Sequence, residues 1–373
     1  MCSSSLLRKA DPMFKPNRRC GAWLIVVVVY FGFTACGVDP QVPANPNTNE
    51  TARALLRYLH DLPNRPNKRV ISGQRLHDFY GDDARYTPPT TNHPLGQVFN
   101  KTGQWPGIVS AEYTNWRYSG TNQRVIWREL NPVLIDYWKK GGLVELHFHP
   151  IGPSGALGTP KENLDAILNS DGTFNTTYMA LLDQAVAGLR NLQDNGVVVL
   201  WRPVHDFAGP FWWGGSPDRH RRVWKHMFNY FKGKGLNNLL WVLSSYGTGA
   251  HRDYWAGPQY VDILGVDWGV DWPTFDRQVA GARGLGKPLA ITQTGESNGK
   301  IFDLTLIINT IRNRAPEVTF FIEFSTGVDF AGVGWDQSIG SGPSGPSGSA
   351  LMNDPWVINR GEIDFRDTPT PRR

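Results

Sequence analysis

Short apolar, β-branched runs alternate with longer segments of helical period along most of the chain. A run of four to eight such residues between turn formers is typical of a strand, and apolar positions three and four residues apart are typical of a helix. Eight runs fit the strand pattern: Val70–Gln74, Gly107–Tyr113, Leu143–Phe148, Val197–Arg202, Asn238–Ser244, Val261–Val266, Leu289–Thr292 and Thr319–Phe324. Segments of helical period lie between them, among them Gln123–Lys140, Tyr178–Asn195, Arg219–Lys234 and Phe302–Arg314.

This repeat of strand and helix predicts an α/β fold, the (β/α)8 TIM barrel, in which parallel strands close into a ring. The runner-up is an open doubly wound sheet, which eight units at this spacing fit less well. No Gly-rich phosphate loop follows the first strand, so nucleotide binding has no support. In a barrel the chemistry lies at the C-terminal ends of the strands, and the polar residues there are the candidates for a site.

The composition fits a large folded domain. Of the 373 residues, 40% are hydrophobic, 12% aromatic and 19% charged, which excludes a disordered or collagen-like chain. The counts of 15 Trp, 40 Gly and 27 Pro are high, and many Trp beside many loop formers suggest aromatic platforms on long loops that stack on sugars. Tryptophans that fill the core would give the same count, so both interpretations stay open.

The first 36 residues have the order of an export signal. Basic residues extend to Arg19, an apolar run follows from Ala22 to Phe33, and Cys36 comes shortly after it. The segment resembles a bacterial lipoprotein signal, in which Cys36 is lipidated and anchors the protein to the outer membrane or cell surface. An uncleaved anchor is the alternative, and either one predicts an exported protein. We expect residues 1–36 to be this signal, 37–51 a flexible tether, and 52–373 a single barrel domain that is a monomer.

The charge distribution argues against nucleic-acid binding. The net charge is +5, but residues 1–36 hold five Lys or Arg against Asp11 and so supply +4 of it. No Lys/Arg-rich run follows, and a nucleic-acid-binding surface would need one. All three cysteines, Cys2, Cys20 and Cys36, also lie in this leader, so the domain after it has neither a disulfide nor a thiolate site.

Polar residues gather where the predicted strands end. The fourth strand ends in Arg202, His205 and Asp206, and the loop after it carries the paired aromatics Trp212 and Trp213. Charged groups that hold one another beside stacking rings fit a sugar site. A structural ion pair beside core tryptophans is the alternative.

The third strand places Glu145, His147 and His149 at every second position, so all three face the same side. His-x-His could suggest a metal, but no third ligand stands at a diagnostic spacing, and we expect no metal here. The sixth to eighth strands end in further candidates, which are Asp267, Trp268, Gln293 and Glu323.

Several motifs recur in order at the predicted strands and carry a family resemblance. They are Trp201–Asp206 (Trp-Arg-Pro-Val-His-Asp) with Phe211–Gly214, Asn238–Val242, Tyr260–Asp267 and Lys287–Gly295, with Ile71–Gln74, Thr102–Gly107 and Asn353–Val357 as further matches. As a set they resemble glycoside hydrolase family 26, over roughly residues 50–362. The resemblance implies a (β/α)8 barrel, endo-β-1,4-mannanase activity and no cofactor, because the reaction needs only carboxyl groups and water. It also places the Gly/Ser/Pro stretch 338–349 in a long loop of the last unit.

Four positions depart from the pattern of that family. The resemblance implies glutamates at Asp206, as acid/base, and at Gln293, as nucleophile, with Asn at Ala208 and Tyr at Gly269. The neutral amide of Gln293 cannot form the glycosyl ester of a retaining mechanism. Asp206 can still donate a proton if burial raises its pKa, although its carboxyl group lies one methylene further back. The shorter side chain favours a wider gap in which a water is activated, as in inverting enzymes.

A changed mechanism needs a replacement base. We place Glu323 first, because it shares a strand-end layer with Gln293, and an ion pair with Arg202 is its structural alternative. The other available carboxylates are Glu296, Glu112 and Glu145. A further mechanism uses an N-acetyl group of the substrate as nucleophile, with Asp206 as acid and Gln293 orienting the acetamide.

Two hypotheses follow from these residues. The first is an exported, lipid-anchored hydrolase of mannan-type polysaccharide with Asp206 as acid and a displaced base. His147, Arg202, His205, Asp267 and Gln293 would position the sugar, and Trp212, Trp213, Trp268 and Trp116 would form stacking subsites. The second is a catalytically inactive descendant that binds polysaccharide at the cell surface. A carboxylate opposite Asp206 would discriminate them, since an inactive protein has no reason to retain one.

Overall fold

The computed structural model describes residues 41–76, 94–115, 123–152, 163–168, 176–207, 209–245, 249–268, 272–295, 303–323 and 345–366. The chain divides into two units, Met1–Gly37 and Val38–Arg373, and every described residue belongs to the second. The residues of the leader named above, Cys36 among them, lie outside the described part, and so do Trp116, Ala208, Gly269 and Glu296. Among the described residues no helix combines the length and the apolar character needed to cross a bilayer.

The strands close into a parallel ring. They are β1 (Val70–Ile71), β2 (Gly73–Arg75), β3 (Ile108–Glu112), β4 (Leu143–Phe148), β5 (Val199–Pro203), β6 (Leu239–Ser245), β7 (Ile263–Trp268), β8 (Leu289–Thr294), β9 (Val318–Glu323) and β10 (Val357–Ile358). Each strand from β2 to β8 pairs in parallel with the next, and β9 pairs with both β8 and β2. This closure confirms the predicted (β/α)8 barrel and excludes the open sheet. The short β1 and β10 add a parallel extension beside β9.

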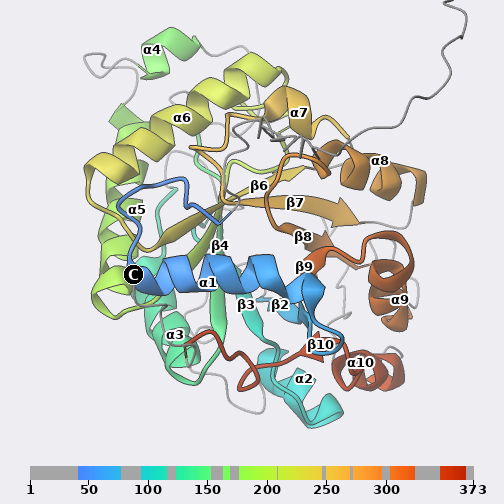
Figure 1. The fold of residues 1–373 in the computed structure, drawn as a ribbon. Coiled ribbons are helices and arrows are strands. Elements are labelled where there is room, and N and C mark those ends of the chain that lie inside the picture. The colour runs from blue at the N-terminus through green and yellow to red at the C-terminus, as the bar shows by residue number, and fades with distance from the viewer. Residues whose placement is uncertain are drawn as a thin grey trace, which may run out of the picture. The chain divides into compact units, whose positions relative to one another are not determined.

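The helices surround the ring of strands (Figure 1). They are α1 (Glu50–Asp61), α2 (Pro94–Thr102), α3 (Trp127–Lys139), α4 (Leu164–Leu168), α5 (Thr176–Asp194), α6 (Pro217–Gly233), α7 (His251–Tyr254), α8 (Trp272–Ala282), α9 (Thr305–Arg314) and α10 (Gly345–Met352), with a 3-10 turn at Leu62–Asn64. Helix α6 begins at Pro217, two residues before the predicted segment that starts at Arg219, because the Ser216 side chain accepts from the Arg219 N–H and Pro217 fits the first turn. Helix α10 includes residues 345–349 of the stretch expected to be a loop, so that expectation is wrong for these residues.

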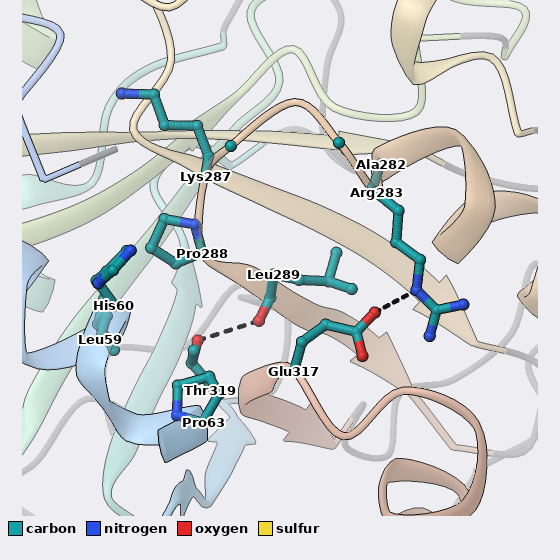
Figure 2. Close-up of a pocket in the computed structure, with 12 residues that line it drawn as sticks. Leu59, His60, Pro63, Ala282, Arg283, Lys287, Pro288, Leu289, Glu317 and Thr319 are labelled. Carbon is teal, nitrogen blue, oxygen red and sulfur yellow. Dashed lines mark hydrogen bonds and ion pairs between the residues drawn. The ribbon is translucent and has the colours of Figure 1, made fainter. Parts of the chain in front are cut away.

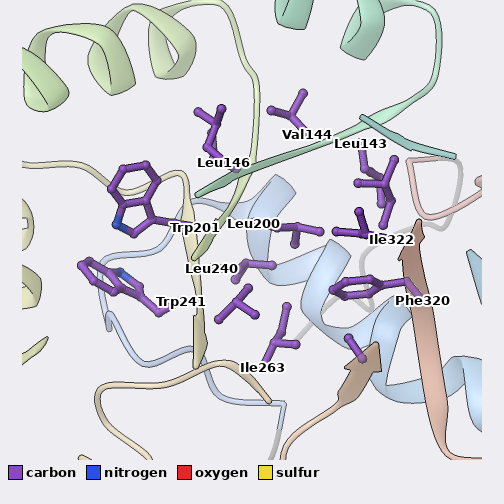
Figure 3. Packing of buried hydrophobic residues seen from close by; sticks show 14 of the residues in the cluster. Leu143, Val144, Leu146, Leu200, Trp201, Leu240, Trp241, Ile263, Phe320 and Ile322 are labelled. Atoms are coloured by element: carbon purple, nitrogen blue, oxygen red, sulfur yellow. The ribbon is translucent and has the colours of Figure 1, made fainter. Parts of the chain in front are cut away.

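Part of the high tryptophan count belongs to the core. Trp201 of β5 and Trp241 of β6 are partners on neighbouring strands. Their rings lie 5.8 and 6.1 Å from the ring of Phe231 on α6. Figure 3 shows the two indoles close together among aliphatic side chains of the strands. These rings seal the barrel against the helices, so their role is packing.

The segment expected to be a flexible tether packs on the barrel domain from about residue 44. The Ala44 N–H donates to the buried carboxylate of Asp262 at 2.6 Å, and the Asn45 side chain is buried. Asn49 caps helix α1 by accepting from the Ala52 N–H at 2.8 Å. The tether prediction is therefore wrong here, because these Asn residues cap and anchor the backbone instead of leaving it solvated.

A hollow opens at the N-terminal ends of β8 and β9, where both strands begin (Figure 2). Leu289 and Thr319 lie in its floor, and the Thr319 hydroxyl donates to the Leu289 carbonyl at 3.1 Å. An ion pair between Arg283 and Glu317 borders it. In barrels this end serves stability, and the polar strand-end residues lie at the other end.

Candidate active site

The C-terminal ends of the barrel strands bring the predicted site residues together. The register of neighbouring strands pairs Glu112 with His147, His147 with Arg202, Asp267 with Gln293, and Glu323 with Gln74. Most of these side chains are buried although they are polar. Buried polar groups need partners, so the strand ends must form a hydrogen-bonded network or a binding site.

The first part of this network is an ion pair between β4 and β5. The Arg202 Nε donates to Glu145 Oε1 at 2.7 Å, and both side chains are fully buried. The Ser110 hydroxyl donates to the other carboxylate oxygen, which lies 3.4 Å from His147 Nδ1. Arg202 is thus fixed by Glu145, and the expected alternative pairing with Glu323 is not the one formed.

A second carboxylate, Glu112, holds His149. Its Oε2 is hydrogen-bonded to His149 Nδ1, and its Oε1 accepts from the Thr114 N–H at 2.9 Å and from the Thr114 hydroxyl at 2.6 Å. Burial alone would raise the pKa of Glu112, but the charge and the hydrogen bond of His149 outweigh it and hold this pKa below its usual value. Glu112 therefore stays ionised and orients the imidazole.

His147 and His205 are buried beside His149. The ring centres of His147 and His205 are 5.5 Å apart, and those of His149 and His205 are 4.2 Å apart. Burial, followed by the charge of Arg75 for His147 and of Arg202 for His205, lowers the pKa of each well below 6.5. Both imidazoles are therefore neutral at pH 7 and can accept as well as donate hydrogen bonds.

The chain after β5 takes an unusual backbone path that aims His205 and Asp206. Val204 and Asp206 have φ angles of 41° and 57°, in the left-handed region that non-Gly residues enter at a cost. Two hydrogen bonds hold the loop in this path: Trp213 Nε1 donates to the His205 carbonyl at 3.0 Å, and the Gly209 N–H donates to the Asp206 carbonyl at 2.6 Å. The surrounding structure thus maintains a strained conformation at the predicted acid, as is common at functional sites.

Asp206 forms an electrostatic pair with Asp267. The Asp206 side chain is 22% exposed, yet its Oδ1 is buried and has no hydrogen-bond partner in the described part of the chain. Burial raises the pKa of Asp206, and nearby His149 and Arg202 oppose this. Burial and the charge of Asp206 raise the pKa of Asp267 to about 7, although Thr292 donates to its Oδ1 at 2.9 Å. The protonation of Asp267 is thus linked to the charge of Asp206.

The paired tryptophans pack inside this loop. Trp212 and Trp213 are fully buried, and Trp212 Nε1 donates to the Pro150 carbonyl at 2.7 Å. Phe211 stacks on Trp213 with ring centres 4.6 Å apart, and Phe211 is only half-buried. Neither indole offers a face to solvent, so their expected role as stacking subsites does not fit this structure. Of Trp268, the backbone alone is described, at the end of β7.

Glu323 does not have the environment of a base that activates water. Its side chain is 1% exposed, and its Oε2 accepts from Gln74 Nε2 at 2.7 Å. Burial raises its pKa well above 4.5, and the single hydrogen bond from Gln74 opposes this only in part. The expected role of Glu323 as the displaced base therefore does not fit, because a carboxyl group that keeps its own proton cannot accept one from water.

Replacing Glu323 by Gln is expected to stabilise the protein at pH 7. The raised pKa means that the folded state binds a proton which the unfolded chain releases above about pH 4.3. The stabilising contribution of this proton is present below the unfolded pKa and is lost as the pH rises toward the folded pKa. The Gln variant keeps the shape of the side chain and the hydrogen bond with Gln74, and it has no titrating proton, so its stability does not fall with pH in this way. Urea unfolding should therefore show a higher midpoint than for the wild type at pH 7 and the same midpoint near pH 4. A Glu317→Gln variant, at the surface pair with Arg283, serves as control. A less stable Glu323→Gln protein at pH 7 would contradict this prediction.

The sequence reasoning missed Arg75. It is buried at the end of β2, and its charge lowers the pKa values of His147, His205 and Asp206. The predicted first strand stopped at Gln74, one residue short of it. An Arg in the last position of a barrel strand was the signal that could have found it.

A group of potential metal ligands also forms here. His149, His205 and Asp206 each offer one ligand atom, and these atoms all lie within 4.8 Å of one another. Spacing along the sequence could not find this group, because its members come from the ends of two different strands, β4 and β5.

Comparison with known proteins places this geometry in a family. The family model described as "Glycosyl hydrolase family 26" matches residues 44–362. The chain belongs to this family. The match confirms the resemblance found in the sequence and agrees with a site built at the C-terminal strand ends of a barrel.

The family relatives are similar along most of this chain. A Bacillus subtilis protein named mannan endo-1,4-beta-mannosidase is 31% identical over 358 residues, covering 88% of this chain and 91% of its own. "Mannan endo-1,4-beta-mannosidase A and B" of Caldalkalibacillus mannanilyticus is 32% identical over 347 residues; the match covers 86% of this chain and only 63% of that longer protein.

Two solved structures are similar to this chain over most of its length. The YdhT protein from Bacillus subtilis is similar with a TM-score of 0.75 at 29% identity, and Bacillus subtilis mannanase man26 with a TM-score of 0.72 at 29% identity. Each match covers 88% of this chain and 98% of that one. The similarity thus extends over the whole barrel and not only the strand-end motifs.

Proposed function

We propose that this protein is an exported endo-acting hydrolase of β-1,4-mannan-type polysaccharide and that Asp206 is its general acid. The names of the family relatives support the substrate class. The observation that carries the role of Asp206 is its half-buried carboxyl group, with one oxygen unpaired and its pKa raised by burial. A general acid must hold its proton at working pH and still reach the glycosidic oxygen, and this environment favours both.

Asp267 fits the part of the displaced base better than Glu323 does. Its Oδ2 is buried without a hydrogen-bond partner in the described structure, and its pKa is linked to the charge of Asp206. Two carboxyl groups whose charges interact divide naturally into one acid and one base. The neighbouring Gln293 cannot form a glycosyl ester, so we infer that Asp267 activates a water and that the anomeric configuration is inverted.

The second candidate function is binding of the polysaccharide without cleavage. It is favoured by Gln293, which stands beside Asp267 as a neutral amide where the family resemblance implies a nucleophilic carboxylate. The pair formed by Asp206 and Asp267 favours hydrolysis, because a protein that only binds has no need of two coupled carboxyl groups.

Reducing-end release by the purified full chain on mannan, glucomannan and mixed-linkage glucan tests the proposal, with the anomer of the product followed by NMR. We expect cleavage of mannan with inversion, and its loss in Asp267→Asn. A retained configuration would contradict the role of Asp267. Retention of mannan in affinity electrophoresis with no cleavage would overturn the hydrolase and establish the binding function.

We further propose that residues 1–36 export the protein and that Cys36 carries the lipid anchor. The support is the order of basic, apolar and cysteine residues in the sequence. Incorporation of labelled palmitate into the wild type and into Cys20→Ser, but not into Cys36→Ser, is the expected result. Equal labelling of all three would refute the anchor at Cys36.

A further inference from the structure

His149, His205 and Asp206 meet beside one another after the ends of β4 and β5. One ligand atom from each lies within 4.8 Å of the other two, and His205 Nε2 is 3.8 Å from Asp206 Oδ2. In a tetrahedral site the bonds from metal to ligand are about 2.0–2.2 Å long, and the ligand atoms lie somewhat closer to one another than the three atoms do here. Small side-chain rotations would therefore bring the three onto one ion.

The surroundings of His149 are those of a metal-binding histidine. Its Nδ1 is hydrogen-bonded to the carboxylate of Glu112, which Thr114 holds from the other side. In its neutral form, a histidine whose Nδ1 proton is donated to a carboxylate has its lone pair on Nε2, and a metal ion that binds there replaces the second proton of the charged form. Carboxylate–histidine pairs of this kind orient metal ligands in many proteins and raise their basicity.

The other two residues carry buried atoms without partners. His205 is 3% exposed, and its Nδ1 has no hydrogen bond within the described residues; the same is true of Asp206 Oδ1. Buried polar atoms without partners are costly, and each needs a reason such as a bound ion. Since the Asp206 side chain is 22% exposed, an ion from solvent can reach this point.

Charged groups of both signs surround these three residues. Glu112, Glu145 and Asp267 supply carboxyl groups near them, against the guanidinium groups of Arg75 and Arg202. Two imidazoles with one carboxylate favour a borderline ion such as Zn²⁺ over Mg²⁺ or Ca²⁺, which prefer oxygen ligands.

We propose that His149, His205 and Asp206 form a binding site for a divalent cation of the zinc class, with a remaining position open to water or to a sugar hydroxyl. Binding of the ion does not depend on the proposed hydrolysis. The two are linked through Asp206, because a carboxylate that ligates the ion cannot carry the proton of a general acid. Occupation of the site would therefore switch the acid off.

Calorimetric titration of Zn²⁺ into the full chain, after treatment with a chelator and in the absence of substrate, tests this site. Cys2, Cys20 and Cys36 are replaced by Ser in every sample, so that leader thiolates contribute nothing. We expect one ion per chain, loss of binding in His149→Gln, His205→Gln and Asp206→Asn, and binding weakened about 10- to 100-fold in Glu112→Gln. His226→Gln, at a half-buried histidine outside the group, should bind like the parent protein.

Near-UV circular dichroism checks that each variant is folded. If a histidine variant does not fold, the comparison of the parent protein with Asp206→Asn tests the site instead. The absence of binding to the parent protein would overturn the proposal, as would equal binding to the parent and to Asp206→Asn, since the ion would then lie elsewhere. Inhibition of hydrolysis is not used as the readout, so an inactive protein that binds one Zn²⁺ at this group would support the metal site while refuting the proposed hydrolysis.

Discussion

Asp206→Asn is expected to lower kcat for mannan hydrolysis by about 10²- to 10⁴-fold while the protein stays folded and still binds the polymer. This is the usual contribution of proton transfer by a positioned general acid. The substituted amide has the same shape, and the loop that positions it is held through backbone groups, because the Gly209 N–H bonds to the Asp206 carbonyl and Trp213 to the His205 carbonyl. The loss should therefore fall on kcat and leave KM nearly unchanged.

The pH profile makes this prediction sharper. Because burial and the Asp206 charge raise the pKa of Asp267 to about 7, removal of that charge in Asp206→Asn lowers the pKa of Asp267. The residual activity should then lose its alkaline limb, which depends on the acid, and its acidic limb should move to lower pH. Asp218→Asn, an exposed change at the start of α6, should match the wild type in rate and profile.

Full activity of Asp206→Asn would assign the acid to another residue. A loss confined to KM would instead make Asp206 a residue that binds the sugar. The wild-type rate, measured on the same polymer, is the control for both outcomes.

The fold could be predicted from the sequence because barrel strands have a local signature. All eight predicted strands overlap strands of the ring. The first run is divided into β1, which pairs with β10, and β2, which pairs with β3, and nothing local in the sequence predicts a partner as distant as β10. Strands are set by periodicity, whereas such interruptions are set by distant contacts.

The candidate site could be located but not fully interpreted. Strand-end positions correctly brought His147, Arg202 and Asp267 together, because parallel strands in a barrel place their C-terminal ends at one face. The sequence could not show that Glu323 is buried and protonated, or that Trp212 turns inward to bond a carbonyl. The burial and the direction of a side chain depend on the loops above the strands. Loops have no regular pattern of apolar positions, so neither property could be predicted from the sequence.

Arg202→Met is expected to destabilise the protein by about 3–5 kcal/mol. The Arg202 guanidinium and the Glu145 carboxylate are both fully buried and joined at 2.7 Å, so the substitution leaves a carboxylate in the core without its cation. Removal of one member of a buried pair has this cost because the remaining charge was taken out of water and is no longer compensated. Urea unfolding at pH 7 measures it, and Arg283→Met at the half-exposed surface pair with Glu317 should cost under about 1 kcal/mol.

The double variant Arg202→Met with Glu145→Gln separates the energy of the pair from the penalty of an isolated charge. Glutamine can still accept the hydroxyl hydrogen bond of Ser110 but carries no charge. We therefore expect the double variant to be more stable than Arg202→Met alone, although it lacks more of the native network. If the second substitution instead added to the loss, Glu145 would stabilise the fold through groups other than Arg202, and the penalty of an isolated charge would be refuted. If Arg202→Met alone lost no more stability than Arg283→Met does, Glu145 would gain another partner or a proton when Arg202 is removed.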